Sequence, residues 1–80
     1  MEIKVLGPGC DKCRKLYSET EKALAAAEVE ATLTKIEKID QIVSYGVMLT
    51  PALVIDDQVL VVGKVPPVHE LTDLIRNAAG

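Results

Sequence analysis

The sequence has no Phe and no Trp, and its only aromatic residues are Tyr17 and Tyr45. Without aromatic side chains on which bases could stack, a platform for single-stranded nucleic acid is not expected. The formal net charge of −3, with 9 Lys and Arg against 12 Asp and Glu, offers no basic patch for nucleic acid or for an anionic membrane. Uninterrupted apolar runs reach only four or five residues, which excludes a membrane span. Neither nucleic acid nor a membrane is therefore an expected partner.

The chain is short, and we expect its 80 residues, 1–80, to form a single domain. Hydrophobic residues make up 49% of it and charged residues 26%, a balance that indicates a folded, soluble domain and not a disordered chain. The first residues enter an apolar strand pattern directly, without the basic start and long apolar stretch of a secretory signal. We therefore expect a cytoplasmic protein, and we expect it to be a monomer.

Cysteine is also scarce: Cys10 and Cys13 are the only two, three positions apart, where an apolar strand pattern gives way to a helix pattern. Side chains three apart on a helix lie roughly 5–6 Å from each other, close to the spacing of about 4.4–6.8 Å between the Cα atoms of a disulfide. Closing so short a loop stabilises a fold very little. In a reducing cytoplasm the pair is expected to be catalytic or metal-binding instead of a permanent bridge.

Hydrophobic periodicity predicts an α/β fold with the element order βαβαββα. The first strand–helix–strand unit implies two parallel strands joined by a right-handed crossover, and a later hairpin adds antiparallel strands, which gives a mixed four-stranded sheet with three helices. The predicted strands are Ile3 to Val5, Val29 to about Ile36, 52–55 and 59–62, and the last two are expected to be buried strands of a tight hairpin. The first predicted helix is 11–27, and the last is opened by Pro66 and Pro67. Between them we expect a short helix marked by Ile39, Ile42 and Val43, with Gly46 as its cap.

The helix patterns also predict which side chains are buried. Cys13 falls on the inner stripe of the first helix, whereas Cys10 falls at or before its first residue, where nothing in the helix covers it. In the last helix we expect an inner face and, opposite it, a solvated face that carries His69. The inner face would be Val68, Leu71, Leu74, Ile75 and Ala78, and the solvated face would include Thr72, Asp73 and Arg76.

For two further features, the sequence allows two interpretations each. Tyr17 lies one turn beyond Cys13 and is interpreted as the edge of the core, although it could line the site. The stretch 46–49, Gly-Val-Met-Leu, leads into Thr50 and Pro51 and forms either an exposed docking patch beside Cys10 or part of the core.

The element order and two motifs resemble the thioredoxin/glutaredoxin superfamily. The motifs are Gly7-Pro8-Gly9-Cys10-Asp11-Lys12-Cys13 after the first strand and Thr50-Pro51 before the strand Ala52-Leu53-Val54-Ile55-Asp56, and the likeness spans the whole chain. Among its members, the small prokaryotic thioredoxin-like proteins labelled redox-active disulfide protein 2 are most similar. The sequence departs from better-known members, because no Trp precedes Cys10, no Pro separates the cysteines, and nothing near 63–65 matches the glutathione-holding Gly-Gly-x-Asp stretch.

The resemblance implies thiol-disulfide exchange on protein disulfide substrates. It assigns Cys10 as the attacking cysteine and Cys13 as the resolving one. It also implies that Pro51 is cis and that the backbone of Thr50 is available to pair with a substrate chain. The redox-active Cys10–Cys13 disulfide would be the only redox group, with no further cofactor, and a flavoprotein disulfide reductase could supply electrons.

The chemistry requires a thiolate, because the thiolate and not the thiol attacks a disulfide. A helix N-terminus carries about half a positive charge, and Lys12 adds a cation beside Cys10. We expect both to lower the pKa of Cys10 below the free-thiol value of about 8.5.

Two other functions remain open. Two thiolates at this spacing could carry a soft metal ion, either Cu(I) or, with ligands from elsewhere, zinc. A closed zinc site would need two more ligands, and the chain has one histidine. The third function is a binding module in which the pair is redox-inactive.

Overall fold

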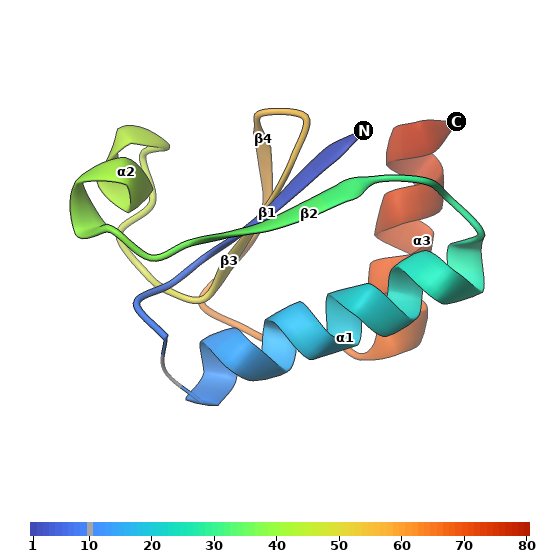
Figure 1. The fold of residues 1–80 in the computed structure, drawn as a ribbon, viewed down its shortest axis with the longest axis horizontal. Coiled ribbons are helices and arrows are strands. Elements are labelled where there is room, and N and C mark those ends of the chain that lie inside the picture. Colours follow the sequence, from blue (N-terminus) through green and yellow to red (C-terminus); the bar gives the residue numbers. More distant parts are fainter. Residues whose placement is uncertain (10) are drawn as a thin grey trace.

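The computed structural model describes residues 1–9 and 11–80, and its elements follow the predicted order. Figure 1 shows how the helices lie around a small sheet. The elements are β1 (Glu2–Leu6), α1 (Asp11–Ala27), β2 (Thr32–Ile36), α2 (Ile39–Ser44), β3 (Ala52–Ile55), β4 (Gln58–Val62) and α3 (Val68–Ala79). None of the helices described is long and apolar enough to cross a membrane.

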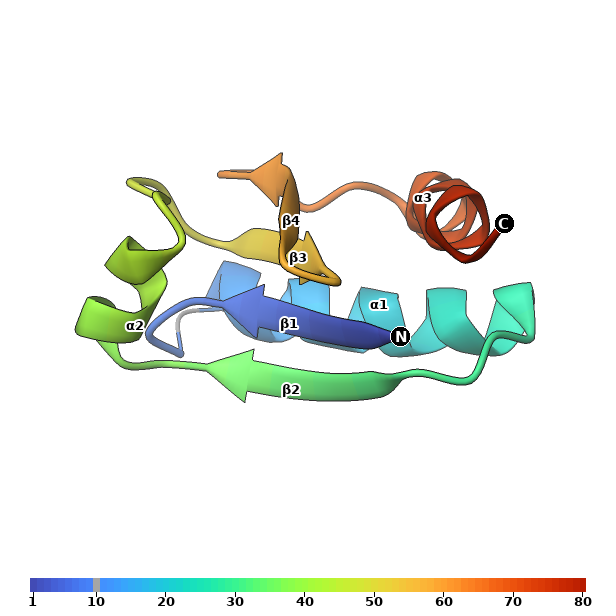
Figure 2. The same ribbon diagram turned by 90° about the horizontal axis from the view of Figure 1, so that it is seen from above.

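The four strands form one mixed sheet in the order β2-β1-β3-β4, visible side by side in Figure 2. β1 pairs with β2 in parallel and with β3 antiparallel, and β3 pairs antiparallel with β4. The β3–β4 connection is a two-residue turn, in which Asp56 and Asp57 both have positive φ, 47° and 66°. Positive φ at both central residues is the requirement of a type I′ hairpin turn. The predicted α/β class and mixed four-stranded sheet are confirmed.

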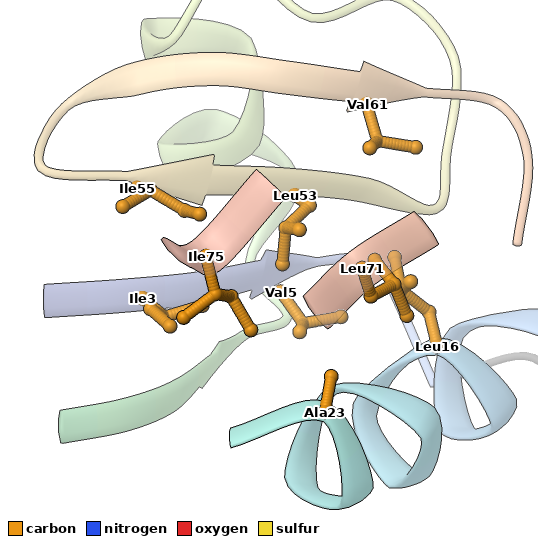
Figure 3. Packing of buried hydrophobic residues seen from close by; sticks show 9 residues of the cluster. All are labelled: Ile3, Val5, Leu16, Ala23, Leu53, Ile55, Val61, Leu71 and Ile75. Carbon is orange, nitrogen blue, oxygen red and sulfur yellow. The ribbon is translucent and has the colours of Figure 1, made fainter. Parts of the chain in front are cut away.

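The two faces of the sheet have separate cores. Alternate side chains of a strand point to opposite faces, so Val5 of β1 joins the core under α1 and α3, and its neighbour Leu6 joins the core under α2. Figure 3 shows the larger core, in which strand residues meet α1 and α3. The buried residues of this larger core are Ile3, Val5, Leu16, Ala23, Leu53, Ile55, Val61, Leu71 and Ile75.

α1 buries one stripe along its length, as the periodicity predicts. Its buried residues are Cys13, Leu16, Thr20 and Ala23, spaced three or four apart. Thr20 is polar but satisfied, since its hydroxyl donates a hydrogen bond of 2.7 Å to the carbonyl of Leu16. Asp11 in the first turn matches the positive end of the helix dipole. The stripe brings Cys13 to the carboxyl end of β1.

Three sequence predictions about the fold are wrong in detail. β2 begins at Thr32 and not at Val29, because its pairing starts where β1 starts, at Glu2 opposite Thr32. β4 is not a buried strand: Val61 faces the core, but Leu60 and Val62 are 38% and 43% exposed. β4 lies at the open edge of the sheet, and its register shifts opposite Leu53 and Val54; of its residues only Val61 is buried.

The third error concerns α3. Ala78 is exposed and not part of the inner face, since it lies in the last turn of the helix, beyond the core contacts of Leu74 and Ile75. Thr72 is buried and not solvated, with its hydroxyl donating a 2.7 Å hydrogen bond to the carbonyl of Val68. His69 is exposed, as predicted.

Candidate active site

The site is built where three chain segments meet at one end of the sheet. They are the loop after β1, the first turn of α1 and the segment that enters β3. Parallel strands end at the same edge, so the residues that follow β2 also reach this place. The predicted attacking residue Cys10 lies outside the described residues.

Cys13 occupies the first turn of α1 with only 5% of its surface exposed, so the predicted inner position is confirmed. Its sulfur lies against the backbone of Gly7: a Cβ atom added at Gly7 would overlap Sγ of Cys13 and come within 2.9 Å of its Cβ. The same added atom would lie 3.9 Å from Cβ of Thr50. The buried thiol and Thr50 therefore both lie beside Gly7, whose amide donates a 2.9 Å hydrogen bond to the carbonyl of Ile36.

Pro51 is fully buried, and the peptide bond between Thr50 and Pro51 is cis, the isomer that the resemblance implies. The carbonyl of Pro51 accepts a 2.7 Å hydrogen bond from the amide of Gly63, which ties the segment to the end of β4. Thr50 is half-buried. Lys12, predicted to tune the pKa of Cys10, is exposed in the first turn of α1.

A charged cavity of about 210 Å³ opens on one side of the loop at Gly7. Cys13 forms part of its wall, so the buried thiol borders a polar space. Lys35 of β2 and Glu37, just after it, alternate with Ile36 and so point to the same side. Besides Val5, the lining comprises Gly7, Gly9, Cys13, Arg14, Lys35 and Glu37.

Two contacts hold cations around this charged cavity. The ammonium of Lys35 lies 4.7 Å from the centre of the Tyr17 ring, a cation–π distance. Arg14 forms an ion pair with Asp11 in the first turn of α1. Tyr17 packs against the larger core as predicted, and it also supports a cation of the cavity wall.

Sequence reasoning missed Lys35 and Glu37. The signal was available, because a parallel partner of β1 must end beside the loop that carries the cysteines, and the residues after it then border the same site. The spacing on either side of Ile36 would have placed both charges on one face. Their distance in sequence from Cys13 concealed the relationship.

An apolar groove of about 230 Å³ lies on the other side of the loop. α2 forms one wall, and the segment leading to Pro51 forms the other. Residues 46–49 were interpreted either as an exposed patch or as part of the core, and the structure shows some of each. Val47 is buried in the smaller core, whereas Met48 and Leu49 are 86% and 64% exposed. The groove is lined by Pro8, Ile39, Ile42, Val43, Val47, Met48 and Thr50.

Metal binding finds no further support among residues 1–9 and 11–80, where no cluster of three or more His, Cys, Asp and Glu side chains could hold an ion. The described part of the site thus combines a buried thiol, a charged cavity and an apolar groove around one loop.

Comparison with known proteins finds matches over most of the chain. Residues 1–76 match the family model described as "Thioredoxin domain". A protein named thioredoxin from Methanocaldococcus jannaschii is 29% identical over 75 residues, which cover 94% of this chain and 86% of that protein. Another from Methanothermobacter thermautotrophicus is 28% identical over 75 residues, covering 94% and 97%. A probable thioredoxin from Archaeoglobus fulgidus is 33% identical over 73 residues, covering 91% and 79%.

Proposed function

Since the chain belongs to the thioredoxin domain family, we propose that it is a thiol-disulfide oxidoreductase that uses Cys10 and Cys13 on protein disulfides. The observation that carries the proposal is the position of Cys13. Its thiol is buried in the first turn of α1, pressed against Gly7 and near Thr50, three residues after Cys10 in the sequence. A thiol kept from solvent is suited to react within the protein and not with outside reagents.

The proposed reaction reduces the substrate in two exchanges. The thiolate of Cys10 attacks one sulfur of the substrate disulfide, forms a mixed disulfide and releases the first substrate thiolate, which takes up a proton. Cys13 loses its proton and attacks the sulfur of Cys10, which releases the second substrate thiol. The substrate has then gained two electrons and two protons, and Cys10 and Cys13 are joined as a disulfide.

We assign Thr50 and Pro51 to substrate binding and Lys12 to lowering the pKa of Cys10. The apolar groove, which borders Thr50, would hold an apolar side chain of the substrate next to its disulfide. A flavoprotein disulfide reductase would return the electrons, with no cofactor beyond the cysteine pair. We further propose that residues 1–80 act as one monomeric domain in the cytoplasm, where low-molecular-weight thiols keep cysteines reduced.

Trapping of mixed disulfides tests the assignment. Cys13→Ser should accumulate a covalent complex with a disulfide-bonded protein such as insulin, because the residue that resolves it is missing, whereas Cys10→Ser should trap none. Non-reducing electrophoresis and intact mass measure both. Equal trapping by the two variants would refute the roles given to the cysteines.

The same preparation separates redox chemistry from metal transport. Thiol titration before and after mild oxidation should show two thiols lost together in the wild type, and metal analysis should show no bound ion in stoichiometric amount. Stoichiometric copper or zinc together with no turnover of insulin would instead favour the metal carrier.

A further inference from the structure

The apolar groove contains a sulfur atom that the proposed reaction does not use. Met48 lies in the segment between α2 and β3, two residues before Thr50, and its side chain forms part of the groove wall. At 86% exposure it is the most exposed of the large apolar side chains that the structure describes. A thioether in this position is open to oxidants in solution.

The chain contains one other methionine, and its surroundings are different. Met1 is partly buried and packs against the larger core, and its carbonyl accepts a 3.0 Å hydrogen bond from the amide of Thr32. Met1 lies at the start of β1, at the opposite end of that strand from the site. The two methionines therefore form an internal comparison of an exposed thioether and a shielded one.

We propose that Met48 is an oxidative modification site, and that its sulfoxide weakens the binding of protein substrates in the apolar groove. The inference rests on the proposed function, because it requires that substrates cover this groove. Peroxide transfers one oxygen atom to the thioether sulfur, which is oxidised by two electrons to the sulfoxide, and the peroxide is reduced to water. No cysteine takes part in this step.

The physical reason lies in the neighbours of Met48. Ile39 and Val43 are exposed on the apolar wall of the groove, and a substrate that covers it removes these side chains from water. A thioether is favourable in such a contact, while a sulfoxide carries a strong dipole that must lose its water without gaining a hydrogen-bond donor from these neighbours. A small disulfide does not cover the groove and is not affected.

The experiment begins with the disulfide form of the protein, in which the cysteines are protected from peroxide. After limited treatment with hydrogen peroxide, peptide mapping should find an addition of one oxygen on Met48 well before Met1. The peroxide is then removed, and dithiothreitol returns the cysteine pair to the dithiol and supplies electrons for turnover. Insulin reduction should fall about tenfold in kcat/KM, a factor equivalent to 1.4 kcal/mol, which is no more than burial of one apolar side chain of this size contributes. Reduction of hydroxyethyl disulfide, measured in parallel, should change by less than about twofold, since the cysteines are intact.

Variants distinguish the effect of oxidation at Met48 from oxidative damage elsewhere in the protein. Met48→Leu keeps an apolar side chain of similar size but has no thioether, so its insulin activity, relative to its own untreated sample, should not fall on peroxide treatment. Met48→Gln, which introduces a polar group of similar length, should show the reduced insulin activity without any treatment. Leu60→Gln is the matched control, because Leu60 is an exposed apolar residue outside the groove lining, and it should retain full activity.

Each other outcome overturns the inference. If Met48→Leu loses as much activity on treatment as the wild type, the loss comes from another group. If Met48 is oxidised and insulin reduction is unchanged, the groove does not bind the substrate through this residue. If the untreated protein reduces neither insulin nor hydroxyethyl disulfide, the proposed function itself is wrong, and this inference with it.

Discussion

Gly7 and Cys13 are in direct contact: the backbone of Gly7 occupies the space beside the sulfur of Cys13, and a methyl group at position 7 would overlap it. Gly7 follows the last residue of β1, and Cys13 lies in the first turn of α1. The contact therefore joins the strand to the helix at the site itself. It explains the first glycine of the Gly-x-Gly-Cys motif by a need for space, whereas the second, Gly9, has a φ of +90° that favours glycine for conformational reasons.

Gly7→Ala should destabilise the protein, because the added Cβ would approach Cβ of Cys13 to 2.9 Å and overlap its sulfur. Overpacking of a buried position costs about 1–3 kcal/mol. Urea unfolding under reducing conditions should show a free energy of unfolding lower by that amount, with an unchanged m-value.

A double-mutant cycle identifies the contact responsible. In a Cys13→Ala background the sulfur is gone, so Gly7→Ala should cost at least about 1 kcal/mol less than in the wild type, on the scale of coupling between residues in contact. Equal costs in the two backgrounds would mean that Gly7 is required for a reason unrelated to Cys13.

Lys12→Glu should raise the pKa of Cys10, since a cation near a helix N-terminus is replaced by an anion. The reduction potential of the cysteine pair should then fall by up to about 30 mV for each unit by which this pKa rises. The pH dependence of alkylation of Cys10 in a Cys13→Ser background measures the pKa.

Lys22→Glu provides the matched control, because Lys22 is an exposed lysine of the same helix about three turns further along. It should leave the alkylation profile unchanged. A similar shift in both variants would assign the effect to net charge and not to the position of Lys12, and a lowered pKa for Lys12→Glu would contradict the electrostatic argument.

Asp57→Gly should stabilise the β3–β4 hairpin, because Asp57 has a φ of 66° and glycine adopts this conformation without steric cost. We expect an increase of about 0.5–1 kcal/mol in the free energy of unfolding. Asp57→Ala removes the same carboxylate, which lies 4.0 Å from Lys4, but cannot relieve the backbone. In thermal or urea unfolding, Asp57→Gly should therefore be more stable than the wild type, and Asp57→Ala should be less stable than Asp57→Gly. Equal stability of the two variants would mean that the gain comes from removal of the charge.

Lys4 links the sheet to α2 and should make stability depend on alkaline pH. Its ammonium donates a 2.7 Å hydrogen bond to the hydroxyl of Tyr45, and this bond raises the pKa of Lys4 above its ordinary value of 10.5. A raised pKa contributes stability that is complete below 10.5 and is lost as the pH rises through the folded-state value. The urea midpoint of the wild type should exceed that of Lys4→Met at pH 8 and approach it above the folded-state pKa.

Tyr45→Phe tests the same bond from the other side, because it removes the acceptor and keeps the ring. Its urea midpoint at pH 8 should also be lower than that of the wild type. A difference between the wild type and Lys4→Met that persists unchanged through the alkaline range would show that the hydrogen bond is not the source of the pH dependence.

The order of elements and the inner position of Cys13 could be predicted because each depends on a pattern within about 20 residues of sequence. The stripe of α1 and the Asp-Asp turn of the hairpin are local in this sense. Burial was predicted less well where it depends on a neighbour. Leu60 and Val62 are as apolar as the residues of β3, but β4 lies at the sheet edge and has a partner on one side only.

The amino-acid sequence by itself determined the two-cysteine motif, the helix that begins beside it and the fold class, because spacing along the chain sets which side chains share a face. Only the tertiary structure decided what surrounds Cys13. Glu37 and Lys35 reach the charged cavity because β2 pairs in parallel with β1, and Met48 reaches the apolar groove because Val47 beside it is buried under α2. Such contacts join residues far apart in the chain, and they are set by strand pairing and packing, which no local pattern specifies.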